Sequence, residues 1–352
     1  KLKAVFYKYL LNFKVPGGTS RGVLRQKETY FLKLKDQDNF GVGECALFRG
    51  LSVDDTPDYE HKLQWLCDHI NEDPSILMDE LRDFPSIQFG LEQALLSLRS
   101  NDKFELFPSD FSRGNDRIAI NGLIWMGEEQ YMLKQIQDKL NEGFTTLKLK
   151  IGAIDFETEL KVLRFIRQRY GADQVELRVD ANGAFEVKDA MEKLKKLSEY
   201  ELHSIEQPVK AGQWEGMAAL CAQSPIPIAL DEELIGIIDP FIKKKLLRSI
   251  KPQYIILKPS LIGGFKGSEE WIKLAREQHT GWWVTSALES NIGLNAIAQF
   301  TYTLKNNMPQ GLGTGELFTN NMISPLTVNN GTLFVNTKKK WGNLDQFLNN
   351  KR

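Results

Sequence analysis

The stretch T-T-L-K-L-K-I-G, residues 145–152, decides the fold because it reads as a buried strand that carries two lysines. Side chains alternate between the two faces of a strand, so Lys148 and Lys150 are predicted to point the same way. Two ammonium groups in one interior are costly unless anionic groups pair with them. Acidic residues recur downstream at the ends of further strand-like runs, and they are the predicted partners.

Downstream of residue 115, strand-like runs alternate regularly with amphipathic, helix-like runs. Such alternation predicts parallel strands joined by right-handed helical crossovers. Eight strand signals at a period of roughly 27 residues favour a closed (β/α)8-type barrel over an open sheet. The predicted fold class is therefore α/β, a TIM-like barrel of modified (β/α)7β type, with strands at residues 117–125, 145–151, 175–180, 204–208, 226–231, 254–258, 282–287 and 310–316.

The region before the barrel is organised differently. Residues 1–12, 29–35 and 40–45 have the character of strands, whereas residues 54–99 follow a helical period. Strands followed by helices predict a small α+β unit. The glycine-rich stretch K-V-P-G-G-T-S-R-G-V-L-R, residues 14–25, is predicted to be a mobile loop between the first two strands.

The C-terminal region breaks the alternation of strands and helices. T-V-N-N-G-T-L-F-V, residues 327–335, predicts a hairpin with an Asn-Gly turn. We expect this hairpin to return to the N-terminal unit, close to the start of the barrel. The predicted organisation is an α+β domain, a barrel domain and a returning C-terminal segment, at residues 1–114, 115–320 and 321–352.

Composition narrows the class of protein. The 352 residues have a net charge of -1, which gives no reason to expect nucleic acid or an anionic membrane as a partner. No apolar run approaches the roughly 18 residues of a membrane span. The three cysteines, Cys45, Cys67 and Cys221, are widely spaced, which favours a reducing, cytoplasmic setting without a zinc site. No glycine-rich dinucleotide or P-loop motif is present in the sequence.

Polar residues recur at the carboxyl ends of the predicted barrel strands, where barrel enzymes carry their chemistry. Three acids occupy consecutive strands, and lysines flank them on both sides. The spacings are 30, 26, 25, 27 and 28 residues in the series Lys150, Asp180, Glu206, Asp231, Lys258 and Ser286. Each spacing equals one strand–helix unit, so these side chains are predicted to meet at one rim of the barrel.

Three clustered carboxylates need a cation to stay ionised together. Oxygen ligands without histidine or cysteine favour a hard ion, Mg²⁺ or Mn²⁺, over zinc. A lysine beside such an ion can remove a proton next to a substrate carboxylate, while the ion stabilises the resulting enediolate. The pattern therefore predicts a metal-assisted reaction on a small carboxylate substrate.

Each of these residues also has an ordinary structural interpretation. A single Asp at a strand end most often caps a helix, and Asp231-Glu232-Glu233 reads equally well as an acidic helix start. A single lysine near a strand end usually extends to solvent. Five such residues at one spacing favour the metal site instead. Glu206, within the apolar run S-I-E-Q-P, is the hardest to explain without a cation.

As a set, these motifs resemble the muconate-lactonising subgroup of the enolase superfamily, which uses a Lys or His base with Mg²⁺. The matching stretches are K-L-K (148–150), R-V-D-A-N-G (178–183), I-E-Q-P (205–208), L-D-E (230–232), L-K-P-S (257–260) and, for the family's N-terminal capping domain, G-V-G-E (41–44). The resemblance implies that the Mg²⁺ ligands are Asp180, Glu206 and Asp231. It also implies Lys150 as the acid/base and Lys258 as a cationic group on the opposite face.

Within the subgroup, the sequence most resembles the o-succinylbenzoate synthase family of menaquinone biosynthesis. The supporting stretches are T-S-R-G-V-L-R-Q-K-E-T-Y-F (19–31), T-S-A-L-E-S-N-I-G-L (285–294) and G-L-G-T-G-E-L (311–317). By this resemblance, Lys150 removes the α-proton of 2-succinyl-6-hydroxy-2,4-cyclohexadiene-1-carboxylate and then helps the β-hydroxyl leave as water.

The predicted substrate-binding residues are Lys148, Asn182, Ser286 and Arg25. Arginine suits bidentate recognition of a carboxylate, so Arg21 or Arg25 is expected to meet the succinyl group. A solvated loop charge explains these two arginines about equally well. The oligomeric state is not predicted, because barrel helices and subunit contacts give the same sequence pattern.

Two further classes of function stay open. The same site suits an N-acylamino acid racemase, a dipeptide epimerase or a muconate cycloisomerase, but dipeptide epimerases usually carry Asp-x-Asp where this chain has G-T-G-E, residues 313–316. The alternative of another class is a non-catalytic barrel that binds a metal or a partner. A substituted strand-end residue would support that alternative, and the sequence contains none.

Overall fold

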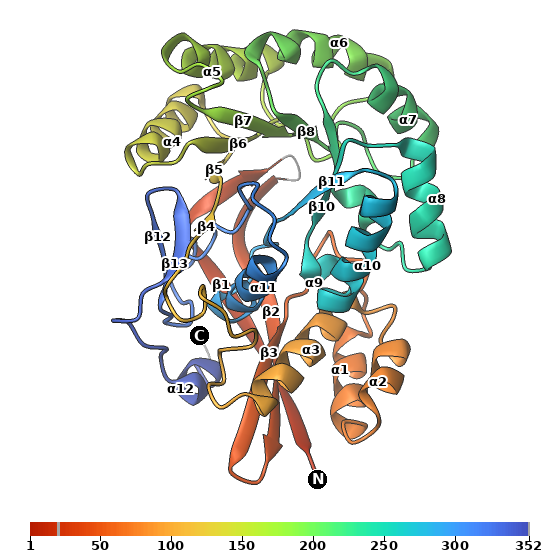
Figure 1. Cartoon of the computed structure of the whole chain (residues 1–352), viewed down its shortest axis with the longest axis vertical. Helices are drawn as coiled ribbons and strands as arrows, with labels where there is room; N and C mark the ends of the chain where they lie inside the picture. Colours follow the sequence, from red (N-terminus) through yellow and green to blue (C-terminus); the bar gives the residue numbers. More distant parts are fainter. Residues whose placement is uncertain (20–21, 351–352) are drawn as a thin grey trace.

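A computed structural model of the chain, which describes residues 1–19 and 22–350, contains a curved sheet of seven parallel strands (Figure 1). The strands pair in the order β11-β10-β9-β8-β7-β6-β5, so each one pairs with its neighbour in the chain. This order confirms the parallel α/β barrel predicted from the sequence. The strands are β5 (Gly122–Ile124), β6 (Thr146–Lys150), β7 (Glu176–Asp180), β8 (Ser204–Glu206), β9 (Ile228–Leu230), β10 (Tyr254–Leu257) and β11 (Gly281–Val284).

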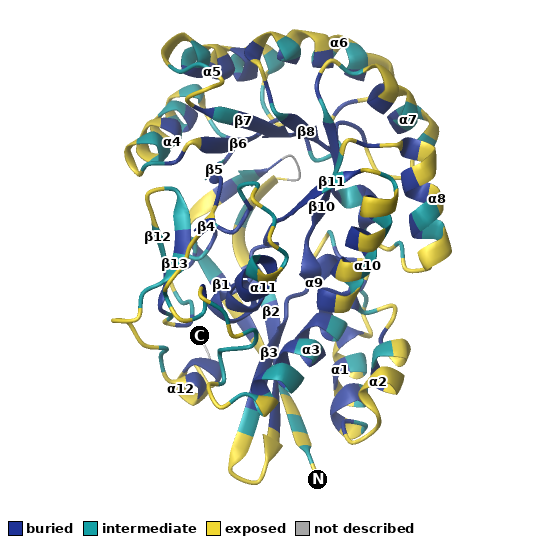
Figure 2. Ribbon diagram, in the orientation of Figure 1, coloured by how far each residue is buried: buried dark blue, intermediate teal, exposed yellow. Residues whose placement is uncertain are grey.

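Helices connect these strands and surround them in Figure 1. Figure 2 shows that the strands are buried, while the outer faces of the connecting helices are exposed. Each helix has apolar residues on one face, which pack against the sheet and form one large core with it. The helices are α4 (Glu129–Asn141), α5 (Phe156–Arg169), α6 (Val187–Leu197), α7 (Trp214–Gln223), α8 (Pro240–Ile250), α9 (Pro259–Ile262), α10 (Gly264–Glu277) and α11 (Asn291–Thr303).

The segment around Gln310 closes the barrel. Gln310 forms a parallel bridge with Ile120, and Gly311 forms one with Thr285, so this segment joins the last strand to the first. The backbone N–H of Val284 also donates to Gln310 Oε1 at 2.7 Å. The sequence predicted a full eighth strand over residues 310–316. The structure forms only these two bridges there, because the side-chain amide of Gln310 replaces part of a backbone ladder.

A separate antiparallel sheet lies at one end of the barrel, and three helices share a small hydrophobic core with it (Figure 1). Its strands β1 and β2 form a long ribbon that reaches to the barrel. This sheet and its helices form the capping domain. The elements are β1 (Lys3–Thr19), β2 (Gly22–Asp36), β3 (Asn39–Cys45), α1 (Tyr59–Asp68), α2 (Pro74–Glu80) and α3 (Pro85–Arg99).

The prediction of a mobile loop over residues 14–25 is wrong for the residues that the structure describes there. Residues 14–19 belong to β1, and residues 22–25 belong to β2. The pairing shifts register between Asn12 and Gly17, and the backbone of Lys14 instead donates to Leu317. The glycines serve close packing here. A Cβ on Gly18 would lie 2.2 Å from the carbonyl oxygen of Met126, which is too close for any other residue.

The C-terminal segment contacts both parts of the molecule. The hairpin of β12 (Leu326–Asn329) and β13 (Thr332–Val335) pairs with β4 (Ile118–Ala119), at the start of the barrel. The following helix α12 (Leu344–Leu348) packs on the capping sheet, where Phe347 stacks on Tyr9 at a centroid distance of 4.4 Å. We propose the domain division 1–114, 115–320 and 321–352 on the basis of these contacts.

Two further properties concern the described residues as a group. Cys45, Cys67 and Cys221 are all buried free thiols. Across residues 1–19 and 22–350, every helix is too short or too polar to cross a membrane.

Candidate active site

Three carboxylates meet at the carboxyl ends of consecutive barrel strands. Asp180 is the last residue of β7, Glu206 is the last of β8, and Asp231 directly follows β9. All three are buried, and one oxygen from each lies within 4.8 Å of the others. The register of the parallel strands produces this cluster, since Asp180 pairs with Glu206 across β7 and β8.

Three buried lysines pair with these carboxylates. Lys150 Nζ lies 2.7 Å from Asp180 Oδ2, and Lys258 Nζ lies 2.7 Å from Asp231 Oδ2. Lys148 Nζ is 3.5 Å from Glu206. Lys148 and Lys150 come from β6 and Lys258 follows β10, so the lysines flank the strands that carry the carboxylates. We call these six residues the strand-end cluster.

The strand-end cluster perturbs the pKa values of its own members. Burial and the neighbouring Asp180 and Asp231 raise the pKa of Glu206 to about 7, against the attraction of Lys148. Burial also lowers the pKa of Lys148, although Glu206 opposes this shift. Burial alone would raise the pKa of Asp180, but the nearby lysines outweigh it and bring the pKa below its usual value.

Lys258 shows the opposite balance. Burial would lower its pKa, but Asp231 and the adjacent Glu232 outweigh burial and raise it above the usual value. Lys258 therefore stays a cation at neutral pH. A permanent cation suits the stabilisation of negative charge in a reaction better than it suits proton removal.

The residues of the cluster fit a hard divalent cation. The candidate ligands are carboxylate oxygens from three strands, which is the ligand type that Mg²⁺ and Mn²⁺ prefer. Glu206 Oε2 is buried and receives no hydrogen bond from any of the described residues, although the ammonium of Lys148 lies 3.5 Å from it. A buried carboxylate oxygen that lacks a hydrogen bond is costly, so it can still accept a cation as a ligand. The chemistry of the donor set and this oxygen therefore agree with a cation site.

A cavity lies over the lysines, with about 650 Å³ of empty space that includes open solvent. Its floor contains Lys148, Lys150 and Lys258, and its walls come from both parts of the molecule. The capping domain contributes mainly apolar side chains, whereas the first and last barrel segments contribute both apolar side chains and hydroxyl and amide groups. These wall residues are Thr19, Leu24, Phe48 and Leu51 from the cap and Asn121, Leu123, Trp125, Thr285, Ser286, Ala287, Leu288, Gly311, Gly313 and Thr314 from the barrel.

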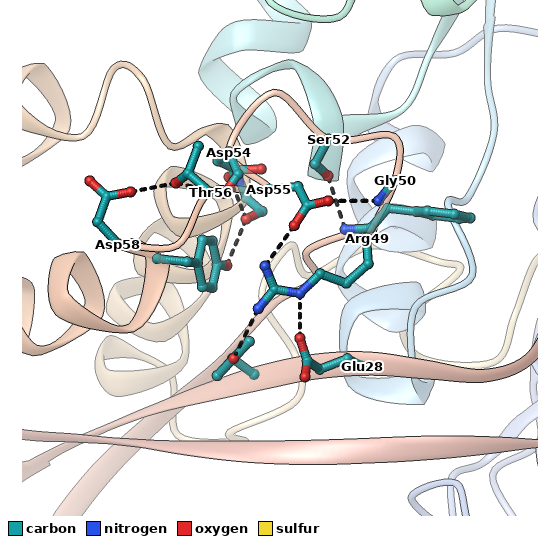
Figure 3. Close-up of polar contacts among 12 residues, drawn as sticks. Glu28, Arg49, Gly50, Ser52, Asp54, Asp55, Thr56 and Asp58 are labelled. Carbon is teal, nitrogen blue, oxygen red and sulfur yellow. Dashed lines mark hydrogen bonds and ion pairs between the residues drawn. The ribbon is translucent and has the colours of Figure 1, made fainter.

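The capping loop, residues 46–58 between β3 and α1, carries Phe48 and Leu51, and Figure 3 shows hydrogen bonds that hold this loop. Arg49 donates to Glu28 at 2.5 Å and to Asp55 at 2.7 Å, and the N–H of Gly50 donates to the second oxygen of Asp55. These bonds tie the loop to itself and to β2. The apolar wall of the cavity therefore rests on a fixed backbone.

The predicted substrate-binding residues lie in different places. Lys148 and Ser286 line the cavity, and Ser286 shares a 2.7 Å hydrogen bond with Thr314. Asn182 lies at the edge of the strand-end cluster, 3.3 Å from Lys150 Nζ. Arg25 is exposed and is not among the cavity residues, whereas its neighbour Leu24 is. Arg21, the other predicted carboxylate partner, lies outside the described residues.

Sequence reasoning missed several residues of the site. Burial, with the nearby Asp231 and Asp180, raises the pKa of Glu232 to about 7, and Glu232 accepts a 2.7 Å hydrogen bond from Asn182. The run D-E-E after β9 was the available signal, and the alternative of a plain acidic helix start obscured it. The cavity walls formed by Leu24, Phe48 and Leu51 had no local signal at all.

The fold is a parallel barrel with a cap, and its strand ends bring carboxylates and lysines together around one cavity. These features are typical of the class of metal-assisted barrel enzymes. Comparison with known sequences agrees with this class. A family described as "Enolase C-terminal domain-like" matches residues 131–342, and one described as "MenC, N-terminal domain" matches residues 2–98.

Individual relatives narrow the class further. The chain is 49% identical to an o-succinylbenzoate synthase of Desulfotalea psychrophila, over 92% of this chain and 96% of the relative. The crystal structure of MenC from the same organism covers 95% of this chain and 99% of its own, with a TM-score of 0.84 and 44% identity. A dipeptide epimerase of Cytophaga hutchinsonii, crystallised with Mg and D-Ala-L-Val, shares the fold at a TM-score of 0.82 and 22% identity, over 95% of this chain and 93% of its own. This chain belongs to the o-succinylbenzoate synthase family of the enolase superfamily.

Proposed function

We propose that this chain is a Mg²⁺-dependent o-succinylbenzoate synthase of menaquinone biosynthesis. Its substrate is then 2-succinyl-6-hydroxy-2,4-cyclohexadiene-1-carboxylate, which loses water to form the aromatic product. The observation that carries this proposal is the strand-end cluster, in which three buried carboxylates and three buried lysines share one cavity. The full-length similarity to a synthase of this name supports the choice of reaction.

Lys150 is the proposed acid and base. Its ammonium nitrogen lines the cavity and lies 2.7 Å from Asp180 and 3.3 Å from Asn182, so both partners fix its position. In its neutral form, Lys150 takes the proton from the ring carbon that bears the carboxylate. The bond to the neighbouring hydroxyl then breaks, Lys150 returns the proton to that oxygen, and water leaves as the ring becomes aromatic.

Asp180, Glu206 and Asp231 are the proposed ligands of the cation. When bound, a divalent cation would stabilise the negative charge that develops on the substrate carboxylate after proton removal. Lys258 faces the same cavity from the other flank, and its raised pKa keeps it charged beside that carboxylate. The apolar cap residues Phe48 and Leu51 would cover the ring and limit the access of water.

The test follows the absorbance of the cyclohexadiene substrate with Mg²⁺ and again with EDTA. We expect fast aromatisation that EDTA stops and that Lys150→Ala abolishes. Deuterium exchange into an N-acylamino acid is measured in parallel, because the same two lysines suit racemisation. Exchange without any aromatisation would reject the synthase and leave the racemase as the function of the site.

A further inference from the structure

A buried carboxylate of the capping domain binds the start of a barrel helix. Glu44, near the end of β3, is fully buried. Its Oε1 accepts from the N–H of Gly293 at 2.9 Å and from the hydroxyl of Ser290, and its Oε2 accepts from the N–H of Ser290 at 3.0 Å. A Cβ on Gly293 would lie 2.8 Å from Glu44 Oε1, so glycine permits this close approach. Glu44 therefore caps α11 from the other part of the molecule.

The helix that Glu44 caps follows directly on a wall of the cavity. Ser286, Ala287 and Leu288 lie between β11 and α11, and all three line the cavity. Leu288 has a φ of 63°, a conformation that costs roughly 1–3 kcal/mol and persists only where its surroundings enforce it. The position of this loop therefore depends on the contacts at its ends.

Glu289 links the same loop to the neighbouring strand end. Its Oε1 accepts from the N–H of Ala287 at 2.7 Å, and its Oε2 accepts from the hydroxyl of Ser260 at 2.6 Å. Ser260 is two residues beyond Lys258 of the strand-end cluster. Contacts thus run from Glu44 through the start of α11 to the cavity wall and on to the segment after β10.

The side chain of Lys27 lies beside these two buried glutamates. Its side chain is buried, and its Nζ has no hydrogen-bond partner among the described residues. Glu289 and Glu44 are the acidic groups that act on it electrostatically, and Nζ lies 5.5 Å from the ring centre of Phe48, another cavity residue. Burial lowers the pKa of Lys27, and Glu289 and Glu44 oppose that shift, so Lys27 acts on this contact through space and not through a hydrogen bond.

We propose that Glu44 is a positioning residue, which sets the shape of the cavity by holding the loop between β11 and α11. This inference rests on the proposed function, because the cavity that it shapes is the substrate site. If Glu44 has this role, the docking of the capping domain on the barrel determines how well the cavity binds substrate. Glu44 touches none of the reacting groups and acts through Ser290 and Gly293.

The chain offers a matched control at a second contact of the same kind. Glu92 of α3 accepts from the N–H groups of Phe265 and Lys266 at 2.8 and 3.1 Å, so it caps α10 from the capping domain. Neither Phe265 nor Lys266 lines the cavity. Glu92→Gln therefore weakens docking of the cap without touching the cavity loop.

The experiment compares Glu44→Gln with Glu92→Gln, with both enzymes kept folded well below their unfolding temperatures. We expect Glu44→Gln to raise KM about tenfold, the factor for one lost charge-assisted hydrogen bond, with a smaller change in kcat. Glu92→Gln should lower the unfolding temperature but leave KM within about twofold of the wild type. A normal KM in Glu44→Gln, or an equal rise in both variants, would overturn the proposal.

Two further measurements keep the test decisive. Ser290→Ala removes the hydroxyl that donates to Glu44 and accepts from the N–H of Ile292, but it keeps both backbone contacts of Glu44. We therefore expect a smaller rise in KM, and this variant can be measured even if Glu44→Gln fails to fold. Hydrogen exchange of the loop after β11 needs no substrate, and Glu44→Gln should accelerate it while Glu92→Gln leaves it unchanged. If the wild type shows no aromatisation, the proposed reaction fails, and the exchange result alone decides whether Glu44 holds the loop.

Discussion

Replacing Glu206 by glutamine should remove most of the stabilisation that a divalent cation gives this protein. Glu206 is fully buried, and one of its oxygens lies within 4.8 Å of oxygens of Asp180 and Asp231. At that distance, two like charges repel by about 3.5 kcal/mol in a medium with an effective dielectric constant of about 20. A bound cation would relieve this repulsion, so we expect the folded state to bind it and the unfolded chain not to.

The size of the effect follows from mass action. A cation present at about 100 times its dissociation constant stabilises the folded state by about 2.7 kcal/mol. The unfolding entropy of a chain of 352 residues is roughly 0.7 kcal/mol/K, so the unfolding temperature should rise by about 4 °C. Binding that is about a hundredfold weaker in Glu206→Gln would leave only about 0.4 kcal/mol, or less than about 1 °C.

The assay is thermal unfolding of each protein with EDTA and then with added Mg²⁺ or Mn²⁺. Glu159→Gln is the control, because Glu159 is also a buried barrel glutamate but lies outside the strand-end cluster. It should keep the full rise of the wild type. An equal rise in Glu206→Gln would refute the assignment of Glu206 as a ligand, and no rise in the wild type would refute the cation site.

Three further predictions concern the framework around the site. Burial raises the pKa of Glu159 to about 8, so its folded form holds a proton that the unfolded chain has lost. The stability that this group contributes therefore falls as the pH rises from about 5 to about 8. In urea unfolding, the wild type should lose about 2 kcal/mol from this group between about pH 6 and pH 8, and Glu159→Gln should not show this loss. Gly18→Ala would place a Cβ 2.2 Å from the carbonyl oxygen of Met126, and calorimetry should show a loss of about 1–3 kcal/mol. Phe347→Ala removes the ring that stacks on Tyr9, and it should cost about 3 kcal/mol and speed hydrogen exchange in α12.

The strand-end cluster was predictable because each of its members lies in a regular repeat. Five of the predicted barrel strands, from 145–151 to 254–258, carry a charged residue at or near the carboxyl end, so Asp180 and Glu206 could be assigned to neighbouring strands from spacing alone. Parallel register then brings them together, as the pairing of these two residues in the structure shows. The roles of the cluster residues as base and ligands stay predictions until the variants are measured.

The cavity walls were not predictable in the same way. Leu24 and Phe48 reach the cavity only because the β1–β2 ribbon and the capping loop dock on the barrel, and no local pattern encodes that docking. The glycines at 17 and 18 indicated a loop, although they serve close packing against Trp125 and Met126. The strand that replaced the loop directs Leu24 to the cavity, while its neighbour Arg25 is exposed.

The barrel supplies the charged groups of the site and the cap supplies apolar walls, and this arrangement explains why one site suits several reactions. Lys150 and Lys258 both reach the cavity, so proton removal and return are possible from either flank of the carboxylates. A lyase needs one base and a leaving group, whereas a racemase needs two bases, and the raised pKa of Lys258 makes it a poor second base near neutral pH. The positive charge of Lys258 thus favours the lyase reaction over racemisation. The apolar wall at Phe48 favours a substrate with a carbon ring over a peptide substrate. A Lys258→Ala variant that loses activity with only one enantiomer of an N-acylamino acid would contradict this assignment, because selective loss requires Lys258 to act as a base.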